Sequence, residues 1–447
     1  MAADKDTIVA IATPSGRGGI GIVRMSGQDL QGAVEELLGS VPEPNKATKA
    51  IFSDAEGNPI DDGLALFFRA PRSYTGEDVL ELHGHGNPVV LRMLVRRCIQ
   101  LGARIAEPGE FTRRAFEHDR IDLAQAESVA DLIDAATEQA ARSAIRSLRG
   151  EFSALIRGFE RDLVELRMLV EAGLDFPDEE LGDESYNDMK QRVSLLAEAL
   201  AQALASSRRG SLLRSGLNVV LAGQPNSGKS SLLNRLAGDD LAIVTPHAGT
   251  TRDPIRETLN IEGIPLNIVD TAGLREADEE IEILGIQRSW RAIGEADLVL
   301  LLVDSTAGVT DADQSILDRI PEKTPRFVVL NKIDLTGELP RRCRTAMGDV
   351  IHLSAKTGAG LDNLRRALLE VAGWQGPDES VFSARQRHVV ALERALEAVR
   401  RAAGQLSNSE LFAEELRLAH ESLGTILGEF LPDDLLGEIF SRFCIGK

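Results

Sequence analysis

The spacing of apolar residues predicts two kinds of structure in the first half of the chain. Short apolar runs at 8–11, 20–23 and 79–82 alternate with clusters of Gly and Pro up to about residue 118. This pattern predicts short strands with one or two helices. From about 120 to 208, Gly and Pro become rare and apolar residues recur at helical spacing, which predicts two or three long helices.

The second half of the chain returns to strand signals and then to helical ones. Apolar strands alternate with helical patterns from 218 to about 371, as is typical of parallel βαβ units. After residues 374–377 the pattern is helical through Cys444. Because neither helical flank looks self-sufficient, we expect the two flanks to pack together, with the α/β domain inserted between them.

These patterns predict a multidomain α+β protein. An N-terminal α/β domain is expected over 1–119 and the first part of a helical domain over 120–212. The inserted α/β domain spans 213–376, and the second part of the helical domain spans 377–447. A chain of 447 residues has room for this many domains, each with its own core.

Composition narrows the classes of function. The chain has 50 Lys and Arg against 70 Asp and Glu, a net charge of −20, which argues against a chain built to coat nucleic acid. Any RNA contact must be local or shared with a partner. The three cysteines, Cys98, Cys343 and Cys444, are too few and too scattered for a disulfide framework or a zinc site. Without a signal-like N-terminus or a long apolar run, the expectation is a cytoplasmic protein with no membrane segment.

A phosphate-binding loop follows the strand expected at 218–222. Residues 223–230 read Gly-Gln-Pro-Asn-Ser-Gly-Lys-Ser and fit the GxxxxGKS pattern, with a helix expected after them. Backbone amides of such a loop cradle phosphates, Lys229 pairs with the β and γ oxygens, and the Ser230 hydroxyl ligates magnesium. The inserted domain is therefore expected to be a P-loop nucleotide-binding domain.

Further motifs, in the order expected of a GTPase, complete the nucleotide site. Asp270-Thr271-Ala272-Gly273 ends an apolar run and places a carboxylate where it can hold magnesium through water. The Asp334 carboxylate of 331–334 can accept from guanine N1–H and the 2-amino group, which predicts GTP rather than ATP. Ser354-Ala355-Lys356 supplies a second wall of the base pocket, and Thr251 could ligate magnesium when the γ-phosphate is present.

The residue that orients the attacking water is left open by these motifs. In Ras-type GTPases a glutamine follows the DxxG motif, whereas this chain has Leu274. An apolar side chain cannot orient water, so another group must do so. The candidates near in sequence are Arg252, Arg275, Glu276, Glu279, Glu280 and Glu282.

Taken together, the motifs resemble the MnmE (TrmE) family of tRNA modification GTPases. The resemblance extends over nearly the whole chain, and its specific part lies outside the GTPase motifs. The segments that carry it are 6–10, 16–19, 74–78, 83–86, 122–127, 223–230, 245–253, 270–273 and the terminal Phe443-Cys444-Ile445-Gly446-Lys447.

The resemblance implies a homodimer joined through N-terminal folate-binding domains, and a helical domain that carries the GTPase domain. It implies the flavoprotein MnmG as partner, in a heterotetramer, and tRNA as substrate. The reaction it implies adds an aminomethyl or carboxymethylaminomethyl group at C5 of the wobble uridine (U34). The one-carbon donor is 5,10-methylene-tetrahydrofolate, for which 5-formyl-tetrahydrofolate serves as an analogue.

The resemblance also assigns residues to the switch chemistry. Potassium is expected on the Asn226 side chain and on carbonyls of Thr245, His247 and Thr250, where its charge offsets that of the transition state. Glu282 matches the family's catalytic glutamate, which orients the attacking water. The GTP-binding residues expected from motifs and resemblance are Asn226, Ser227, Gly228, Lys229, Ser230, Ser231, Thr245, Pro246, His247, Ala248, Gly249, Thr250, Thr251, Asp270, Thr271, Ala272, Gly273, Asn331, Lys332, Asp334, Ser354, Ala355 and Lys356.

For the folate pocket, the matching positions are Arg24, Glu81, Arg120 and Lys447. Family members commonly have lysine where this chain has Arg120, which keeps the charge but changes its geometry. Cys444 has two interpretations: a thiolate nucleophile, or a thiol in a packed terminal segment.

Two other classes of GTPase compete with this interpretation. A ribosome-assembly GTPase, acting as an RNA or protein binding switch, usually has a basic RNA-binding module that this sequence lacks. A membrane-remodelling GTPase calls for a basic amphipathic helix or a lipidation site. Folate binding by the N-terminal domain would separate the first interpretation from both.

Overall fold

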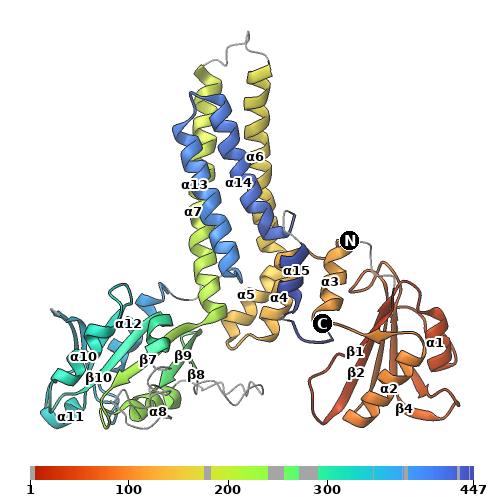
Figure 1. Cartoon of the computed structure of the whole chain (residues 1–447), viewed down its shortest axis with the longest axis horizontal. Helices are drawn as coiled ribbons and strands as arrows, with labels where there is room; N and C mark the ends of the chain where they lie inside the picture. Colours follow the sequence, from red (N-terminus) through yellow and green to blue (C-terminus); the bar gives the residue numbers. More distant parts are fainter. Residues whose placement is uncertain are drawn as a thin grey trace. The chain divides into compact units, whose positions relative to one another are not determined.

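The computed structural model describes residues 6–175, 183–239, 256–270, 290–345, 347–374, 376, 381–429, 433–441 and 443–446. It consists of two compact units (Figure 1). Unit 1 contains Met1–Ala130, Leu148–Glu171 and Leu416–Lys447, and unit 2 contains Asp131–Ser147 and Ala172–Glu415. The mixture of sheets and helices confirms the predicted multidomain α+β fold class. The predicted domain bounds stay predictions.

Unit 1 contains a six-stranded sheet in the order β3-β4-β5-β2-β1-β6. Neighbouring strands are antiparallel, except that β1 and β6 are parallel. The strands are β1 (Ile8–Ile11), β2 (Gly18–Gly27), β3 (Thr48–Ser53), β4 (Pro59–Phe68), β5 (Asp78–Gly86) and β6 (Arg104–Ile105).

Side-chain alternation along β1 separates the two faces of this sheet. Val9 points into a core with α1 (Gln31–Leu38) and α2 (Pro88–Gln100), which cover one face. Ile8 and Ala10 point the other way and pack against Phe111 of α3 (Glu110–Glu117). The segment has one more described helix than the upper number predicted, because α3 buries Glu110 and Arg114 beside Phe111 and Ala115, so its buried face is not an apolar stripe.

Between residues 120 and 215, the described helices outnumber the two or three long ones predicted, and two of them are short. The helices of this stretch are α4 (Leu123–Ile133), α5 (Glu138–Leu148), α6 (Glu151–Asp175) and α7 (Asp183–Ser215). The two long ones agree with the prediction, and the two short ones arise from breaks that composition does not reveal. At one break, the Thr137 hydroxyl accepts from the Ala140 amide at 3.1 Å and begins α5.

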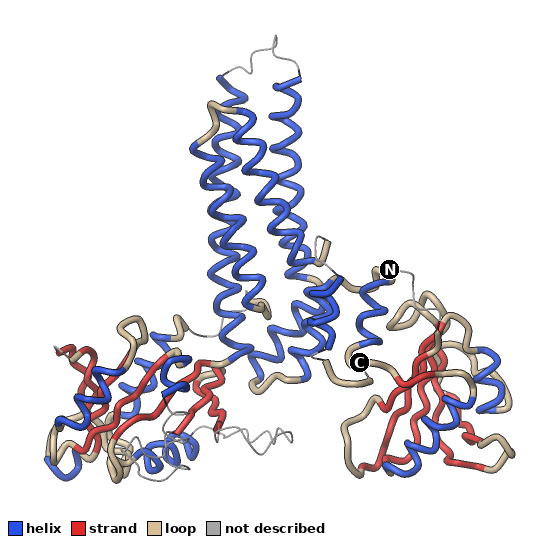
Figure 2. The backbone as a smooth tube through the Cα atoms, viewed as in Figure 1, coloured by secondary structure: helices blue, strands red, loops and turns tan. Residues whose placement is uncertain are grey.

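Unit 2 contains a seven-stranded sheet in the order β12-β13-β11-β10-β7-β9-β8. The inner strands are parallel, and β8 and β12 are antiparallel edges. The strands are β7 (Leu217–Gly223), β8 (Arg256–Ile261), β9 (Ile264–Asp270), β10 (Leu298–Asp304), β11 (Arg326–Asn331), β12 (Arg341–Thr345) and β13 (Gly348–His352). Figure 2 shows the strands of both sheets in red.

Helices cover both faces of the unit 2 sheet, so its central strands are apolar on both sides. Residues 298–303 of β10 are all buried. Leu232 of α8 (Lys229–Asp239) and Leu364 of α12 (Leu361–Val371) belong to the core on one face. Ile316 of α10 (Asp311–Arg319) belongs to the core on the other, and α11 (Ile333–Thr336) follows β11.

The remaining helices are α13 (Gln386–Gly404), α14 (Ser409–Leu427) and α15 (Asp433–Ser441). Within unit 2, α13 packs along α7. Within unit 1, Phe440 and Phe443 join Leu123 and Ala126 in a small core. A search of the described helices finds none with the length and apolar character needed to cross a bilayer.

Candidate functional site

The loop between β7 and α8 has a backbone that only glycine permits at two places. Gly223 has φ of 141°, and a Cβ there would lie 2.2 Å from the Leu302 carbonyl oxygen. Gly228 has φ of 102°, and a Cβ would lie 2.2 Å from Nδ2 of Asn331. The two glycines therefore let the loop close over the carboxyl ends of β10 and β11.

The polar groups of this loop are arranged for an anion. The Lys229 ammonium donates to the carbonyls of Gly223 at 2.9 Å and Gln224 at 3.2 Å, so its charge lies over the loop. The Ser227 hydroxyl is buried and has no hydrogen-bond partner within the described residues. Ser230 and Ser231 are exposed in the first turn of α8, where helix amides favour negative charge. These residues fit a polyphosphate.

Asn331, at the end of β11, connects the phosphate loop to the expected base pocket. Its side-chain amide donates to the Ser227 carbonyl at 2.8 Å, and its Oδ1 accepts from the amides of Lys332 at 2.8 Å and Ala355 at 2.9 Å. Asn331 is 2% exposed, so these bonds are shielded from water. One buried side chain therefore joins three segments that the sequence analysis assigned to a single site.

The base-pocket side of this site is held by Asp334 and Ser354. The Ser354 hydroxyl donates to Asp334 Oδ1 at 2.6 Å and accepts from the Thr357 amide at 3.1 Å. Asp334 is itself exposed, and a carboxylate has about four acceptor positions, so acceptor capacity remains for a ligand.

Two residues of the site were not predicted from the sequence. Asp304, at the carboxyl end of β10, accepts from the Lys332 ammonium at 2.6 Å. That bond, with help from Thr306, lowers the pKa of Asp304 to about 2. Arg235 of α8 donates to the Lys356 carbonyl at 2.6 Å. The position of Asp304 at a parallel strand end was a usable signal, whereas nothing in the sequence marked Arg235.

The described residues include only part of the predicted switch chemistry. The backbone of Asp270 pairs with Leu221 of β7, next to the phosphate loop. The predicted residues outside the described part of the chain are Thr245, Pro246, His247, Ala248, Gly249, Thr250, Thr251, Thr271, Ala272, Gly273, Glu282 and Lys447. The alternative water-orienting residues Arg252, Arg275, Glu276, Glu279 and Glu280 lie outside it as well.

In unit 1, Arg24 and Glu81 lie opposite each other on β2 and β5. The guanidinium contacts Glu81 Oε1 at 2.8 Å, and Glu81 Oε2 contacts the His83 ring at 2.9 Å. Burial alone would raise the pKa of Glu81, but Arg24 and His83 outweigh it and hold the pKa below its usual value. Arg24 also lies over the rings of Phe111, at 5.7 Å, and Tyr74, at 5.9 Å.

The C-terminal segment 443–446 also contacts Arg24. The Gly446 carbonyl accepts from Arg24 at 3.4 Å, and the Cys444 carbonyl accepts from the Gly109 amide at 3.3 Å. The Cys444 side chain is exposed. Arg120 lies beside Gly76, and the described residues give it no hydrogen bond or ion pair with Arg24 or Glu81. Arg24 and Glu81 are thus brought together, and Arg120 is not joined to them.

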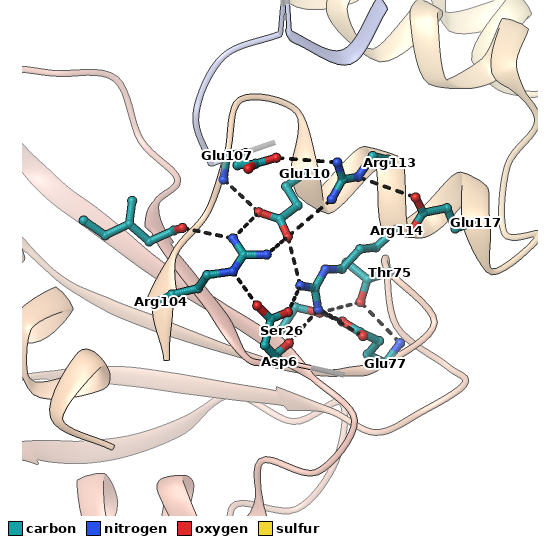
Figure 3. Close-up of polar contacts among 11 residues, drawn as sticks. Asp6, Ser26, Thr75, Glu77, Arg104, Glu107, Glu110, Arg113, Arg114 and Glu117 are labelled. Carbon is teal, nitrogen blue, oxygen red and sulfur yellow. Dashed lines mark hydrogen bonds and ion pairs between the residues drawn. The ribbon is translucent and has the colours of Figure 1, made fainter. Parts of the chain in front are cut away.

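A buried ionic network, drawn in Figure 3, supports this region. Arg114 contacts Asp6 at 2.8 Å, Glu110 at 2.9 Å and Glu77 at 3.1 Å, and Arg104 contacts Glu110 at 2.6 Å. Arg104 also pairs with Asp6. The network fixes α3, and so Gly109, against the sheet. The sequence does not predict this network, because charged residues on a short helix are usually solvated.

Comparison with known proteins agrees with the sequence resemblance. The family described as MnmE helical domain matches residues 123–444, and the family described as GTP-binding protein TrmE N-terminus matches residues 7–120. The tRNA modification GTPase MnmE of Dechloromonas aromatica (strain RCB) is 58% identical over 446 residues, 99% of each chain. That of Nitrosomonas europaea is 56% identical over 447 residues, again 99% of each chain. Among solved structures, Era of Aquifex aeolicus is 28% identical, covers 40% of this chain and 66% of its own, and has a TM-score of 0.28. The chain belongs to the MnmE family of tRNA modification GTPases.

Proposed function

We propose that this chain hydrolyses GTP as part of a reaction that modifies C5 of the wobble uridine (U34) in tRNA. The observation that carries the proposal is Asn331, whose side chain joins the phosphate loop to both segments of the base pocket. Membership of the MnmE family supports the assignment to tRNA. The group added is an aminomethyl or carboxymethylaminomethyl group.

Guanine selection rests on Asp334. Its Oδ1 already accepts from Ser354, which fixes the carboxylate in the base pocket. The remaining lone pairs can accept from guanine N1–H and the 2-amino group. Adenine has no donors at those positions, so it would leave this carboxylate without a partner.

Two cations complete the proposed GTPase mechanism. Magnesium would be held by Ser230 and Thr251. Potassium would be held by Asn226, which is exposed in the loop, together with the carbonyls of Thr245, His247 and Thr250. When bound, these cations would add positive charge beside the phosphates to that of the Lys229 ammonium, and Glu282 would orient the attacking water.

The N-terminal domain is proposed to bind the one-carbon donor, 5,10-methylene-tetrahydrofolate. Arg24 and Glu81 offer a donor and an acceptor side by side, and the rings of Tyr74 and Phe111 lie close to Arg24. These groups suit a flat, polar ring system with a carboxylate tail. Arg120 and Lys447 would add positive charge toward that tail.

The proposed assembly is a homodimer that works with the flavoprotein MnmG in the cytoplasm. The net charge of −20 supports a division of labour in which the partner supplies most of the tRNA-binding surface.

Nucleotide turnover by the purified full-length chain tests this function. We expect faster hydrolysis of GTP than of ATP, and faster hydrolysis in potassium than in sodium. Asn226→Ala should remove the difference between the two cations while GTP binding persists, because Lys229 remains. Equal rates with GTP and ATP would overturn the nucleotide assignment, and equal rates in potassium and sodium would overturn the potassium site.

A further inference from the structure

Helix α6 carries a pocket whose lining residues all lie outside the GTPase motifs of the sequence. It has a volume of about 640 Å³ and belongs wholly to unit 1. Its lining comes from consecutive turns of α6 and from one residue that follows α14. The lining residues are Ala154, Arg157, Glu160, Arg161, Val164, Glu165 and Glu429.

Glu160 is the unusual member of this lining. Its side chain is buried, with the residue 8% exposed, and its Oε1 has no hydrogen-bond partner in the part of the chain that the structure describes. Arg157, a cationic residue of the same lining, contacts Asp122 at 2.9 Å. A buried carboxyl oxygen without a partner is costly, so a ligand that brought a donor to Glu160 through this pocket would stabilise it.

The charges around Glu160 favour a cation. Glu165 and Glu429 add two carboxylates to the lining, against the guanidinium groups of Arg157 and Arg161. Burial, followed by the nearby charge of Glu429, raises the pKa of Glu160 to about 7, and Arg157 acts in the opposite direction. A cation placed between Glu160 and Glu429 would relieve both penalties.

A bare metal ion does not suit this pocket. Within the described residues, only Asp61, Asp62 and His85 bring three possible metal-ligand side chains within 4.8 Å of one another. The carboxylates of the α6 pocket do not converge in that way. The pocket volume also exceeds what an ion needs, so a larger cationic group would suit it better.

The apolar part of the lining suits the stem of such a group. Ala154 and Val164 line the pocket, and Met168 lies one turn beyond Val164 on the same face of α6. Val164 is 39% exposed and Met168 is 64% exposed. Exposed apolar side chains beside a buried carboxylate match a side chain with an aliphatic stem and a charged end.

We propose that this pocket is a docking site for an arginine side chain of a protein partner, with Glu160 as its buried anchor and Glu429 as its second carboxylate. The forked guanidinium can donate to two carboxylates at once, which an ammonium does with less geometric fit. Its stem covers Val164, and the partner's neighbouring residues contact Met168. The site is independent of the nucleotide-binding residues.

Methionine-methyl NMR of the full-length chain tests the proposal. The probes are N-acetyl-arginine amide and its uncharged citrulline analogue, and the reporter is the Met168 methyl resonance, assigned with Met168→Leu. We expect the arginine probe to shift this resonance saturably, and the citrulline probe to bind about tenfold more weakly or not at all. Equal shifts with both probes would overturn the proposal.

Two variants test whether the arginine-dependent shift of the Met168 resonance requires Glu160. Glu160→Gln should abolish the arginine-dependent shift, whereas Asp162→Asn, which removes an exposed carboxylate of the same helix outside the pocket lining, should retain it. A normal shift in Glu160→Gln would overturn the proposal. If that variant fails to fold, Glu429→Gln changes an exposed residue and should still weaken binding about threefold or more. Unchanged binding in Glu429→Gln would contradict the two-carboxylate site.

A further probe separates a protein partner from a free polyamine. Spermidine carries several ammonium groups but no peptide backbone or guanidinium fork. We expect it to shift the Met168 resonance less than the arginine probe does at equal concentration. Tighter binding of spermidine would overturn the assignment to a protein side chain.

Discussion

Asn331 is the residue on which the geometry of the nucleotide site depends most. Asn331→Ala would leave the Ser227 carbonyl and the Ala355 amide without their side-chain partner. Each unsatisfied buried group costs about 1–3 kcal/mol, so we expect GTP affinity to fall about tenfold or more. Equilibrium titration with a fluorescent GTP analogue measures this, and Asn363→Ala, on α12, is the matched control. Unchanged affinity in Asn331→Ala would show that the three segments hold together without it.

A substitution of Asp334 tests which nucleotide base the site selects. In Asp334→Asn an amide replaces one acceptor with a donor, so guanine loses a bond and xanthine, which has a carbonyl in place of the 2-amino group, gains one. We expect the ratio of GTP to xanthosine triphosphate turnover to fall about a hundredfold. Competition kinetics with both nucleotides measures this ratio. Retention of the wild-type preference would place guanine recognition elsewhere.

The raised pKa of Glu160 predicts that the free energy of unfolding depends on pH. The folded chain raises its pKa from 4.5 to about 7, so between these values the folded state binds more protons than the unfolded state. Its contribution to stability is therefore greatest below about pH 4.5 and falls by roughly 3 kcal/mol as the pH rises past 7. Calorimetric unfolding of the wild type and Glu160→Gln at pH 5 and pH 8 tests this. We expect the variant to be the more stable of the two only at pH 8, and a difference that does not change with pH would refute the shift.

At the scale of elements, α3 is held by charge rather than by apolar packing alone. Arg114→Met would leave the buried carboxylates of Glu77 and Glu110 short of a partner, at a cost of about 3–5 kcal/mol. We expect faster hydrogen exchange over α3 and at Gly109, whose amide donates to the Cys444 carbonyl. Arg113→Met is the control, because Arg113 is more exposed and contacts the buried Glu110 only at 3.7 Å. Equal exchange in both variants would mean that the network does not fix α3.

The sequence predicted elements whose signals are local. The strand–loop–helix around Lys229 and the apolar run at 298–303 follow from patterns that depend on neighbouring residues. The sequence could not predict α3 as a buried charged helix, because two partners of Arg114, Glu77 and Asp6, are separated from it by 37 and 108 residues. The link from Asp304 to Lys332 is non-local for the same reason. Local pattern thus predicted the phosphate loop and the base-reading motifs, whose roles stay predictions, while side-chain networks required the fold.

At the scale of the whole molecule, the residues proposed for GTP hydrolysis and those proposed for folate binding belong to different units. Unit 2 contains the phosphate loop and the residues proposed for the base pocket, and unit 1 contains Arg24, Glu81 and the terminal segment with Cys444. If both serve one reaction, a change in unit 1 should abolish tRNA modification and spare GTP hydrolysis. Cys444→Ser is such a change, because its exposed side chain lies outside the GTPase motifs. A thiol is more acidic and nucleophilic than a hydroxyl, so this variant tests chemistry more than packing.

The most direct measurement is nucleoside analysis of tRNA after incubation with the full-length chain, the flavoprotein MnmG, 5,10-methylene-tetrahydrofolate, GTP and either ammonium or glycine, which supplies the amine nitrogen. We expect an aminomethyl or carboxymethylaminomethyl group at C5 of U34 with the wild type. We expect loss of that group, with near-normal GTP hydrolysis, in Cys444→Ser. Unmodified U34 with the wild type, despite GTP hydrolysis and a partner active with another family member, would contradict the proposed function.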